Sequence, residues 1–183
     1  DTTKLEQIEG AIQSNTKLIY IETPSNPCFK ITDIKAVSKI AEKHELLVAV
    51  DNTFMTPLGQ SPLLLGADIV IHSATKFLSG HSDLIAGAVI TNNEAISDAL
   101  YLIQNGTGNM LSAQDSWTLA KHLKTFPIRF KQSVENAQKI VSFLIKQDEI
   151  SEVYYPGLTA SHLEQTKNGG AVIGFRLADE SKA

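Results

Sequence analysis

Short apolar runs alternate with amphipathic segments along the first half of the chain. The apolar runs predict four strands, at Leu18–Ile21, Leu46–Val50, Ala67–Ile71 and Leu84–Ile90. The continuous run at Leu18–Ile21 is typical of a strand that is buried on both faces. Either Thr32 or Asp33 can cap a helix. After them, apolar residues recur at helical spacing: Ile34, Val37, Ile40 and Ala41. Strands alternating with such helices predict an α/β fold with a mostly parallel sheet and flanking helices.

Helical periodicity dominates the rest of the chain. Helices are predicted there at Glu94–Gln104, Ser112–Leu123 and Ile128–Lys146, and in the first half also at Asp1–Ile12 and Pro62–Leu65. Two later strands, at Glu152–Tyr155 and Ala171–Leu177, indicate the start of a small α+β unit. We therefore expect a large domain over residues 1–126 and the start of a smaller C-terminal domain over residues 127–183, with the boundary near Phe126 and Pro127.

Composition and charge exclude several classes of function. The 183 residues carry 16 Lys and Arg against 20 Asp and Glu, so there is no basic excess that would favour nucleic-acid binding. The longest stretch without a formal charge, Asn52 to Ala67, contains prolines and glycines, and we expect no membrane span. The single cysteine, Cys28, fits a reducing compartment, so we expect a cytoplasmic location. His72, His81 and Asp83 match no zinc spacing, and no metal is expected.

Candidate chemistry gathers after the predicted strands, where open α/β sheets bind their ligands. Lys76 follows an apolar strand and the small hydroxyl residues Ser73 and Thr75. A lysine in this place is expected to be partly desolvated, which favours a neutral amine that can form a Schiff base with an aldehyde. The alternative is a surface lysine that reaches a loop carbonyl.

An acidic residue makes the lysine more informative. Pyridoxal phosphate (PLP) needs a lysine for its aldehyde and a carboxylate for its ring nitrogen, and Asp51 ends the second strand. Ser73 and Thr75 can donate hydroxyl hydrogen bonds to a phosphate, and the Asn26 amide can bond a phenolic oxygen. The alternatives are ordinary ones: a turn or helix cap for Asp51, loop caps for the hydroxyls and an Asx-turn for Asn26.

Three segments, in this order and spacing, resemble the Cys/Met-metabolism family of PLP-dependent enzymes. They are Glu22-Thr23-Pro24-Ser25-Asn26-Pro27, Val50-Asp51-Asn52-Thr53-Phe54 and His72 to Asp83, which reads His-Ser-Ala-Thr-Lys-Phe-Leu-Ser-Gly-His-Ser-Asp. The similarity continues through Leu123-Lys124-Thr125 and Tyr155-Pro156-Gly157-Leu158 to Gly169-Gly170, so it covers nearly the whole chain. Family members are about twice as long, and we expect this chain to be part of a longer polypeptide.

The resemblance implies a fold and a role for each candidate residue. The fold would be that of the aspartate-aminotransferase-like (fold type I) large domain, of which residues 1–126 would be the second half. Lys76 would be the catalytic lysine that binds PLP, Asp51 the partner of the ring nitrogen, and Ser73 and Thr75 phosphate ligands. Asn26 would contact the ring hydroxyl, and Thr53 would lie against the cofactor.

The family also implies an activity and its competitors. We expect a carbon–sulfur lyase of sulfur amino-acid metabolism, with a small amino acid as substrate and cystathionine β-lyase as the leading reading. Cystathionine γ-synthase is the closest alternative, followed by cystathionine γ-lyase and methionine γ-lyase. The full-length protein would be a homo-oligomer, a tetramer by resemblance. From a different class, the chain alone could be a non-catalytic fragment that lacks half of the cofactor pocket.

Two departures from the family pattern concern basic residues. Lys121-His122 replaces the Arg-Gly that usually precedes Leu-Lys-Thr. The chain has two arginines, Arg129 and Arg176, and neither matches the position of the arginine that binds the substrate carboxylate in the family.

Overall fold

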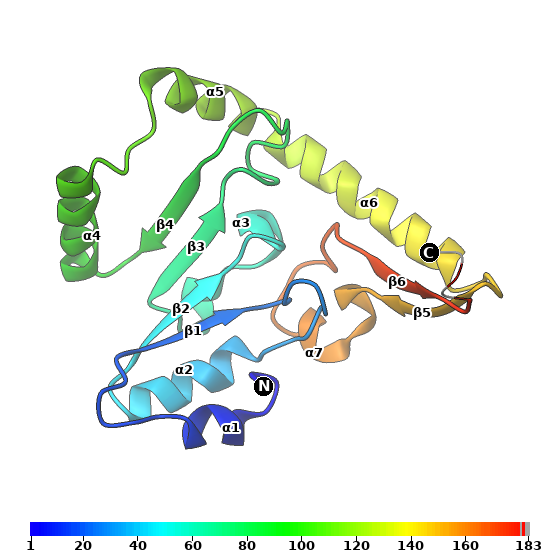
Figure 1. Ribbon diagram of the computed structural model, residues 1–183, viewed down its shortest axis with the longest axis horizontal. Helices are drawn as coiled ribbons and strands as arrows, with labels where there is room; N and C mark the ends of the chain where they lie inside the picture. Colours follow the sequence, from blue (N-terminus) through cyan, green and yellow to red (C-terminus); the bar gives the residue numbers. More distant parts are fainter. Residues whose placement is uncertain (180, 182–183) are drawn as a thin grey trace.

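A four-stranded sheet forms the centre of the computed structural model, which describes residues 1–179 and 181 (Figure 1). Its strands are β1 (Leu18–Glu22), β2 (Leu47–Asp51), β3 (Ile69–Ser73) and β4 (Gly87–Thr91), in that order across the sheet. The first three are parallel, whereas β4 runs antiparallel to β3. The connection from Ser73 to Gly87 contains no α-helix, so β4 returns beside β3 without the crossover that a parallel strand needs. The prediction of a mostly parallel α/β sheet is confirmed.

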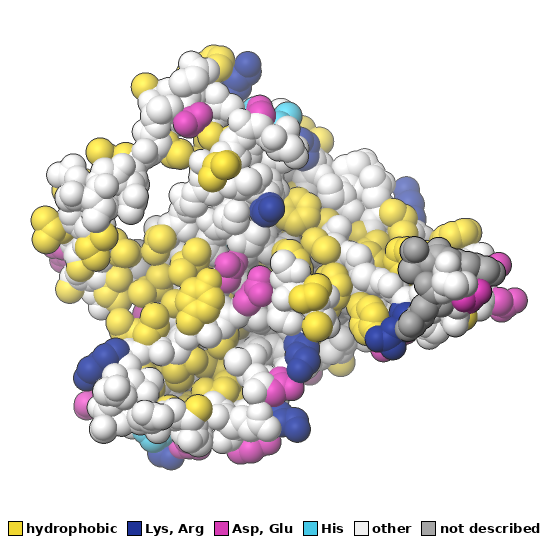
Figure 2. All heavy atoms as spheres, viewed as in Figure 1, with side chains coloured by type: hydrophobic (Ala, Val, Ile, Leu, Met, Phe, Trp, Pro, Cys, Tyr) yellow, Lys and Arg dark blue, Asp and Glu magenta, His cyan; other side chains and the backbone are white. Residues whose placement is uncertain are grey.

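One face of this sheet is buried and the other is open. The paired residues Ile21, Val50 and Val70 are 1%, 0% and 4% exposed. Ile21 and Val50 share one core with residues of α2 (Ile34–Lys43). On the opposite face, Leu18 and Tyr20 are 44% and 53% exposed. Figure 2 shows hydrophobic side chains gathered over the sheet. The prediction that Leu18–Ile21 is buried on both faces is therefore wrong for this chain, because the described residues cover only one face.

Three short helical segments accompany the sheet in its first half. They are α1 (Leu5–Gly10), α3 (Thr56–Gly59) and the 3-10 helix η1 (Pro62–Leu65). Asp33 caps α2 by accepting a hydrogen bond from the amide of Ala36 at 3.0 Å, which decides between the two predicted caps. The sequence pattern missed α3, where Thr56 takes a positive φ of 59° ahead of Pro57. One turn of helix after such a residue leaves no periodicity to detect.

Beyond β4 the chain forms three longer helices, α4 (Glu94–Thr107), α5 (Ala113–Leu123) and α6 (Phe126–Leu144). Helices α4 and α5 bury no residue, and Figure 1 shows them projecting away from the sheet. Helix α6 buries the face that its periodicity predicts, including Phe130, Val134, Ala137 and Val141. No helix within the described part of the chain has both the length and the hydropathy to cross a membrane.

A second, separate sheet pairs β5 (Ile150–Tyr154) antiparallel with β6 (Gly174–Leu177). Between these strands lie the 3-10 helix η2 (Pro156–Leu158) and the short helix α7 (Ala160–Leu163). The observed elements begin or end a few residues from the predicted ones, which is the usual uncertainty at element ends. The division into domains at residues 126 and 127 stays a prediction.

Two buried histidines predict a pH dependence of stability. His162 is 0% exposed; its Nε2 lies 3.1 Å from the carbonyl oxygen of Asn168, and its Nδ1 has no hydrogen-bond partner. Burial lowers the pKa of His162 and also that of His72. The unfolded chain, in which a histidine has a pKa of about 6.5, then binds more protons than the folded chain below that pH. The free energy of unfolding should therefore fall as the pH drops from above 6.5.

Urea unfolding of the full-length polypeptide at several pH values between about 5 and 8, the range over which histidine titrates, measures this effect. His162→Gln, which has no titrating group, should weaken the dependence on pH. A variant with the same slope as the wild type would show that His162 does not contribute.

Candidate active site

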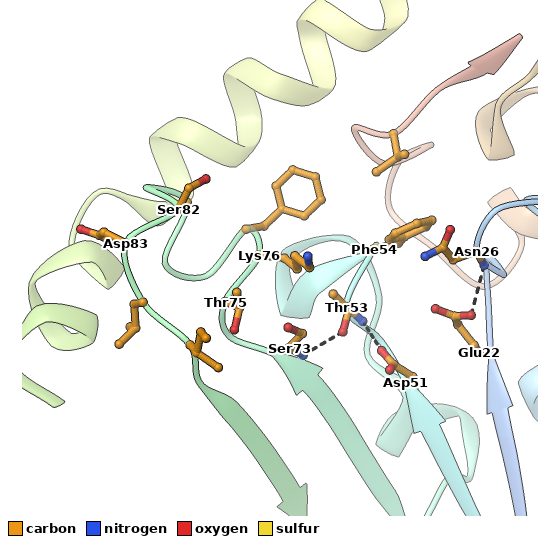
Figure 3. Close-up of a pocket in the computed structure, with 15 residues that line it drawn as sticks. Glu22, Asn26, Asp51, Thr53, Phe54, Ser73, Thr75, Lys76, Ser82 and Asp83 are labelled. Carbon is orange, nitrogen blue, oxygen red and sulfur yellow. Dashed lines mark hydrogen bonds between the residues drawn. The ribbon is translucent and has the colours of Figure 1, made fainter. Parts of the chain in front are cut away.

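The carboxyl ends of β1, β2 and β3 border a hollow of about 1000 Å³ (Figure 3). All six predicted site residues line it: Asn26, Asp51, Thr53, Ser73, Thr75 and Lys76. Parallel strands bring this about, because residues far apart in sequence end at the same edge of the sheet. The structure thus brings the predicted residues together, while their individual roles stay predictions.

Asp51 ends β2 on the open face of the sheet and is held from two sides. Its Oδ1 accepts a hydrogen bond from the amide of Thr53 at 2.9 Å, and its Oδ2 accepts one from the Tyr20 hydroxyl at 3.3 Å. Partial burial, followed by the negative charge of Asp51, raises the pKa of Tyr20, so the phenol keeps its proton. Sequence reasoning missed Tyr20; the period of two along β1 places it on the same face as Glu22, which also lines the hollow.

Thr53 connects the ends of β2 and β3. Its Oγ1 accepts a hydrogen bond from the amide of Ser73 at 2.8 Å, as the dashed line in Figure 3 marks. This bond fixes the direction in which the chain leaves β3, immediately before the segment that carries Lys76. The side chain predicted to lie against the cofactor therefore also holds the backbone of a predicted phosphate ligand.

The Thr75 hydroxyl is already engaged with the backbone. It donates to the carbonyl of Ala86 at 3.2 Å and accepts from the amide of Ala86 at 2.9 Å. Thr75 can donate to a phosphate only if its bond to the Ala86 carbonyl breaks. Ser73 and Thr75 therefore differ as candidate phosphate ligands.

Lys76 lies at the centre of the labelled residues in Figure 3, in a turn where its amide donates to the carbonyl of Ser73 at 3.2 Å. Its side chain is exposed, so the predicted partial desolvation is wrong for this chain. The physical reason is the open face of the sheet: the described residues supply no layer above the hollow.

Asn26 borders the hollow from a loop in which the Thr23–Pro24 and Asn26–Pro27 bonds are both cis. Its backbone amide donates to Oε2 of Glu22 at 3.1 Å, and its side chain is exposed. Glu22 is the acidic neighbour that sequence reasoning did not single out.

The chemistry of the hollow fits PLP in part. An amine for the aldehyde, a carboxylate for the ring nitrogen and a free serine hydroxyl are the groups that the cofactor requires, and all border one space. The charged lining consists of Glu22, Asp51, Asp83 and Lys76, a formal balance of three negative charges against one positive. A phosphate dianion needs further cations at this site. Within the described residues, no three metal-ligating side chains come together.

Comparisons with known proteins agree with this chemistry. The chain is 71% identical over 182 residues to the cystathionine beta-lyase MetC of Staphylococcus haemolyticus. The aligned region covers 100% of this chain and 46% of that protein. It is 46% identical over 188 residues to the cystathionine gamma-lyase of Bacillus subtilis, across 100% of the chain and 49% of that protein. The chain spans about half the length of these curated relatives.

A solved structure extends the likeness to three dimensions. The structure of metB from Corynebacterium glutamicum superposes with a TM-score of 0.94 at 43% identity, covering 97% of this chain and 48% of that one. The fold is therefore that of the fold type I PLP enzymes. The sequence model of the family described as "Cys/Met metabolism PLP-dependent enzyme" matches residues 1–183. The chain belongs to the Cys/Met metabolism family of PLP-dependent enzymes.

Proposed function

We propose that the full-length polypeptide is a PLP-dependent carbon–sulfur lyase that converts cystathionine to homocysteine, pyruvate and ammonia. The observation that carries this proposal is the meeting of Lys76 and Asp51 at one hollow, on a chain that is 71% identical to a protein described as a cystathionine beta-lyase. The pairing of an amine and a carboxylate supports PLP chemistry, and the relative supports the choice of substrate.

Two residues of this chain would carry the chemistry. The Lys76 amine would bind the cofactor's aldehyde and, once displaced by the substrate amine, would take the proton from the substrate α-carbon. Asp51 would hold the proton on the ring nitrogen, and its bonds to Thr53 and Tyr20 keep its carboxylate in one orientation. When bound, PLP supplies an electron sink for the negative charge that develops at the α-carbon.

The remaining candidates would orient the cofactor. Ser73, whose hydroxyl lines the hollow, would donate to the phosphate, and Thr75 would do so after releasing Ala86. Thr53 would lie against the ring, and the Asn26 amide would contact the ring hydroxyl. The cations that the phosphate and the substrate carboxylate need would come from outside this chain, which predicts that the isolated chain is inactive.

Several finer assignments belong to the same proposal. Cystathionine γ-synthase, cystathionine γ-lyase and methionine γ-lyase are the alternatives, because the chain is 46% identical to a cystathionine gamma-lyase as well. A homotetramer is supported by the family and by the apolar side chains exposed on α4 and α5, including Tyr101, Leu102, Ile103 and Trp117. A cytoplasmic location is supported by the single, free Cys28.

Product analysis tests the proposal. The full-length polypeptide, loaded with PLP and given cystathionine, should release pyruvate and homocysteine. Release of 2-oxobutyrate and cysteine would replace the β-lyase with a γ-lyase. A full-length protein that binds no PLP and turns over no sulfur amino acid would refute the proposal.

A further inference from the structure

The turn that follows Lys76 is held by a guanidinium from another helix. Arg129, in the first turns of α6, donates from Nη1 to the carbonyl of Phe77 at 3.2 Å and from Nη2 to the carbonyl of Leu78 at 3.2 Å. The same Nη2 donates to the carbonyl of His122 at 3.1 Å. These carbonyls belong to the two residues immediately after Lys76 and to the end of α5, so a single side chain joins both segments.

Space for this guanidinium is left by a glycine. A Cβ placed on Gly80 would lie 1.8 Å from Nη1 of Arg129, and Gly80 has a positive φ of 73°. Its amide donates to the carbonyl of Lys76 at 2.7 Å, which closes the turn. Any larger residue would both strain this turn and displace Arg129.

Further contacts hold the same turn against α5 and α6. The Phe77 ring packs edge-on against Phe130 at a centroid distance of 5.4 Å. The buried Ser79 hydroxyl lies 3.0 Å from Nδ1 of His122, whose ring stacks on His81 at 3.9 Å. His122, which stands where the family usually has glycine, thus fills a place beside the turn.

We propose that Arg129 is a positioning residue for Lys76. The Lys76 side chain is itself exposed, so its place depends largely on the backbone on either side. Before Lys76, the Thr53 hydroxyl holds Ser73; after it, Arg129 holds Phe77 and Leu78. A guanidinium can bind several carbonyls at fixed angles, which a lysine ammonium cannot reproduce. The inference rests on the proposed function, because it takes Lys76 as the reacting amine.

Amide hydrogen exchange of the full-length polypeptide, measured without PLP, tests the positioning directly. Arg129→Met and Gly80→Ala should each speed exchange over residues 76–80, while peptides from β1 and β2 exchange as in the wild type. Arg129→Lys should fall between the wild type and Arg129→Met. Arg176, the chain's other arginine, is exposed on β6, so Arg176→Met should leave exchange over residues 76–80 unchanged.

Kinetics of the PLP-loaded protein provide the second measurement. Arg129→Met should lower kcat on the order of a hundredfold, the effect of a reacting group displaced by about 1 Å, with a much smaller change in KM. Because Gly80→Ala displaces the same guanidinium, the double variant should be little worse than either single one.

Two results would overturn the inference. One is wild-type exchange over residues 76–80 in both Arg129→Met and Gly80→Ala; the other is faster exchange spread equally over the sheet, which indicates a general loss of stability. If Arg129→Met does not fold, amide exchange over residues 76–80 in Arg129→Lys and Gly80→Ala tests the same inference. A wild-type protein that binds no PLP would refute the proposed function, and the exchange data would still decide whether Arg129 holds the turn.

Discussion

Lys76→Ala in the full-length polypeptide is expected to abolish turnover, with a loss in kcat on the order of 10⁴-fold. The variant removes the amine that would bind the cofactor and move the α-proton, and nearby groups cannot replace it. The other charged groups of the hollow, Glu22, Asp51 and Asp83, are carboxylates. Steady-state kinetics with cystathionine measure the loss of turnover. The visible absorption of the PLP-loaded protein measures the loss of the bond between the lysine and the cofactor.

Matched variants separate chemistry from folding. Lys76 is exposed, so its replacement should leave thermal stability nearly unchanged. Lys121→Ala, at an exposed lysine that lies 4.7 Å from the Trp117 ring, should retain turnover. Methylamine added to Lys76→Ala should restore part of the proton transfer. Full turnover by Lys76→Ala without added amine would refute the catalytic role.

Asp51→Asn is expected to lower kcat on the order of a hundredfold or more, as the loss of one fixed electrostatic contact does in other enzymes. Asparagine has the shape of aspartate and can still accept the Thr53 amide, but it has no charge to hold a proton on the ring nitrogen. The fold should persist, because the bond to Thr53 that orders the end of β2 remains. Kinetics and circular dichroism of the full-length variant measure both outcomes.

Two further variants serve as comparisons for the loss of activity in Asp51→Asn. Tyr20→Phe removes the hydroxyl that donates to Asp51 and leaves the charge, so its effect should be much smaller than that of Asp51→Asn. Asp148→Asn, at an exposed position after α6, should have no effect. Equal activities of Asp51→Asn and the wild type would show that the ring nitrogen has another partner.

The sheet and the meeting of the site residues could be predicted because both follow from local patterns. Apolar runs identify β1, β2 and β3, and a parallel sheet places whatever follows them at one edge. Asp51, Ser73 and Lys76 needed no other information to be brought together. The antiparallel β4 could have been read from the missing helix between Ser73 and Gly87.

What surrounds a site residue could not be predicted in the same way. The exposure of Lys76 depends on a layer above the sheet that the described residues do not supply. The engagement of Thr75 depends on the antiparallel return of Ala86, which is distant in sequence. The sequence shows of Arg129 only that it does not match the arginine that binds the substrate carboxylate in the family. Its three carbonyl partners depend on the packing of α6 against the turn.

The proposed function requires that the Lys76 amine binds the cofactor whose ring nitrogen faces Asp51. Borohydride reduction of the PLP-loaded full-length polypeptide, followed by mass mapping of its peptides, shows which lysine is bound to the cofactor. We expect a single phosphopyridoxyl group on the peptide that contains Lys76, and none in Lys76→Ala. A label on another lysine of the wild-type protein would contradict it.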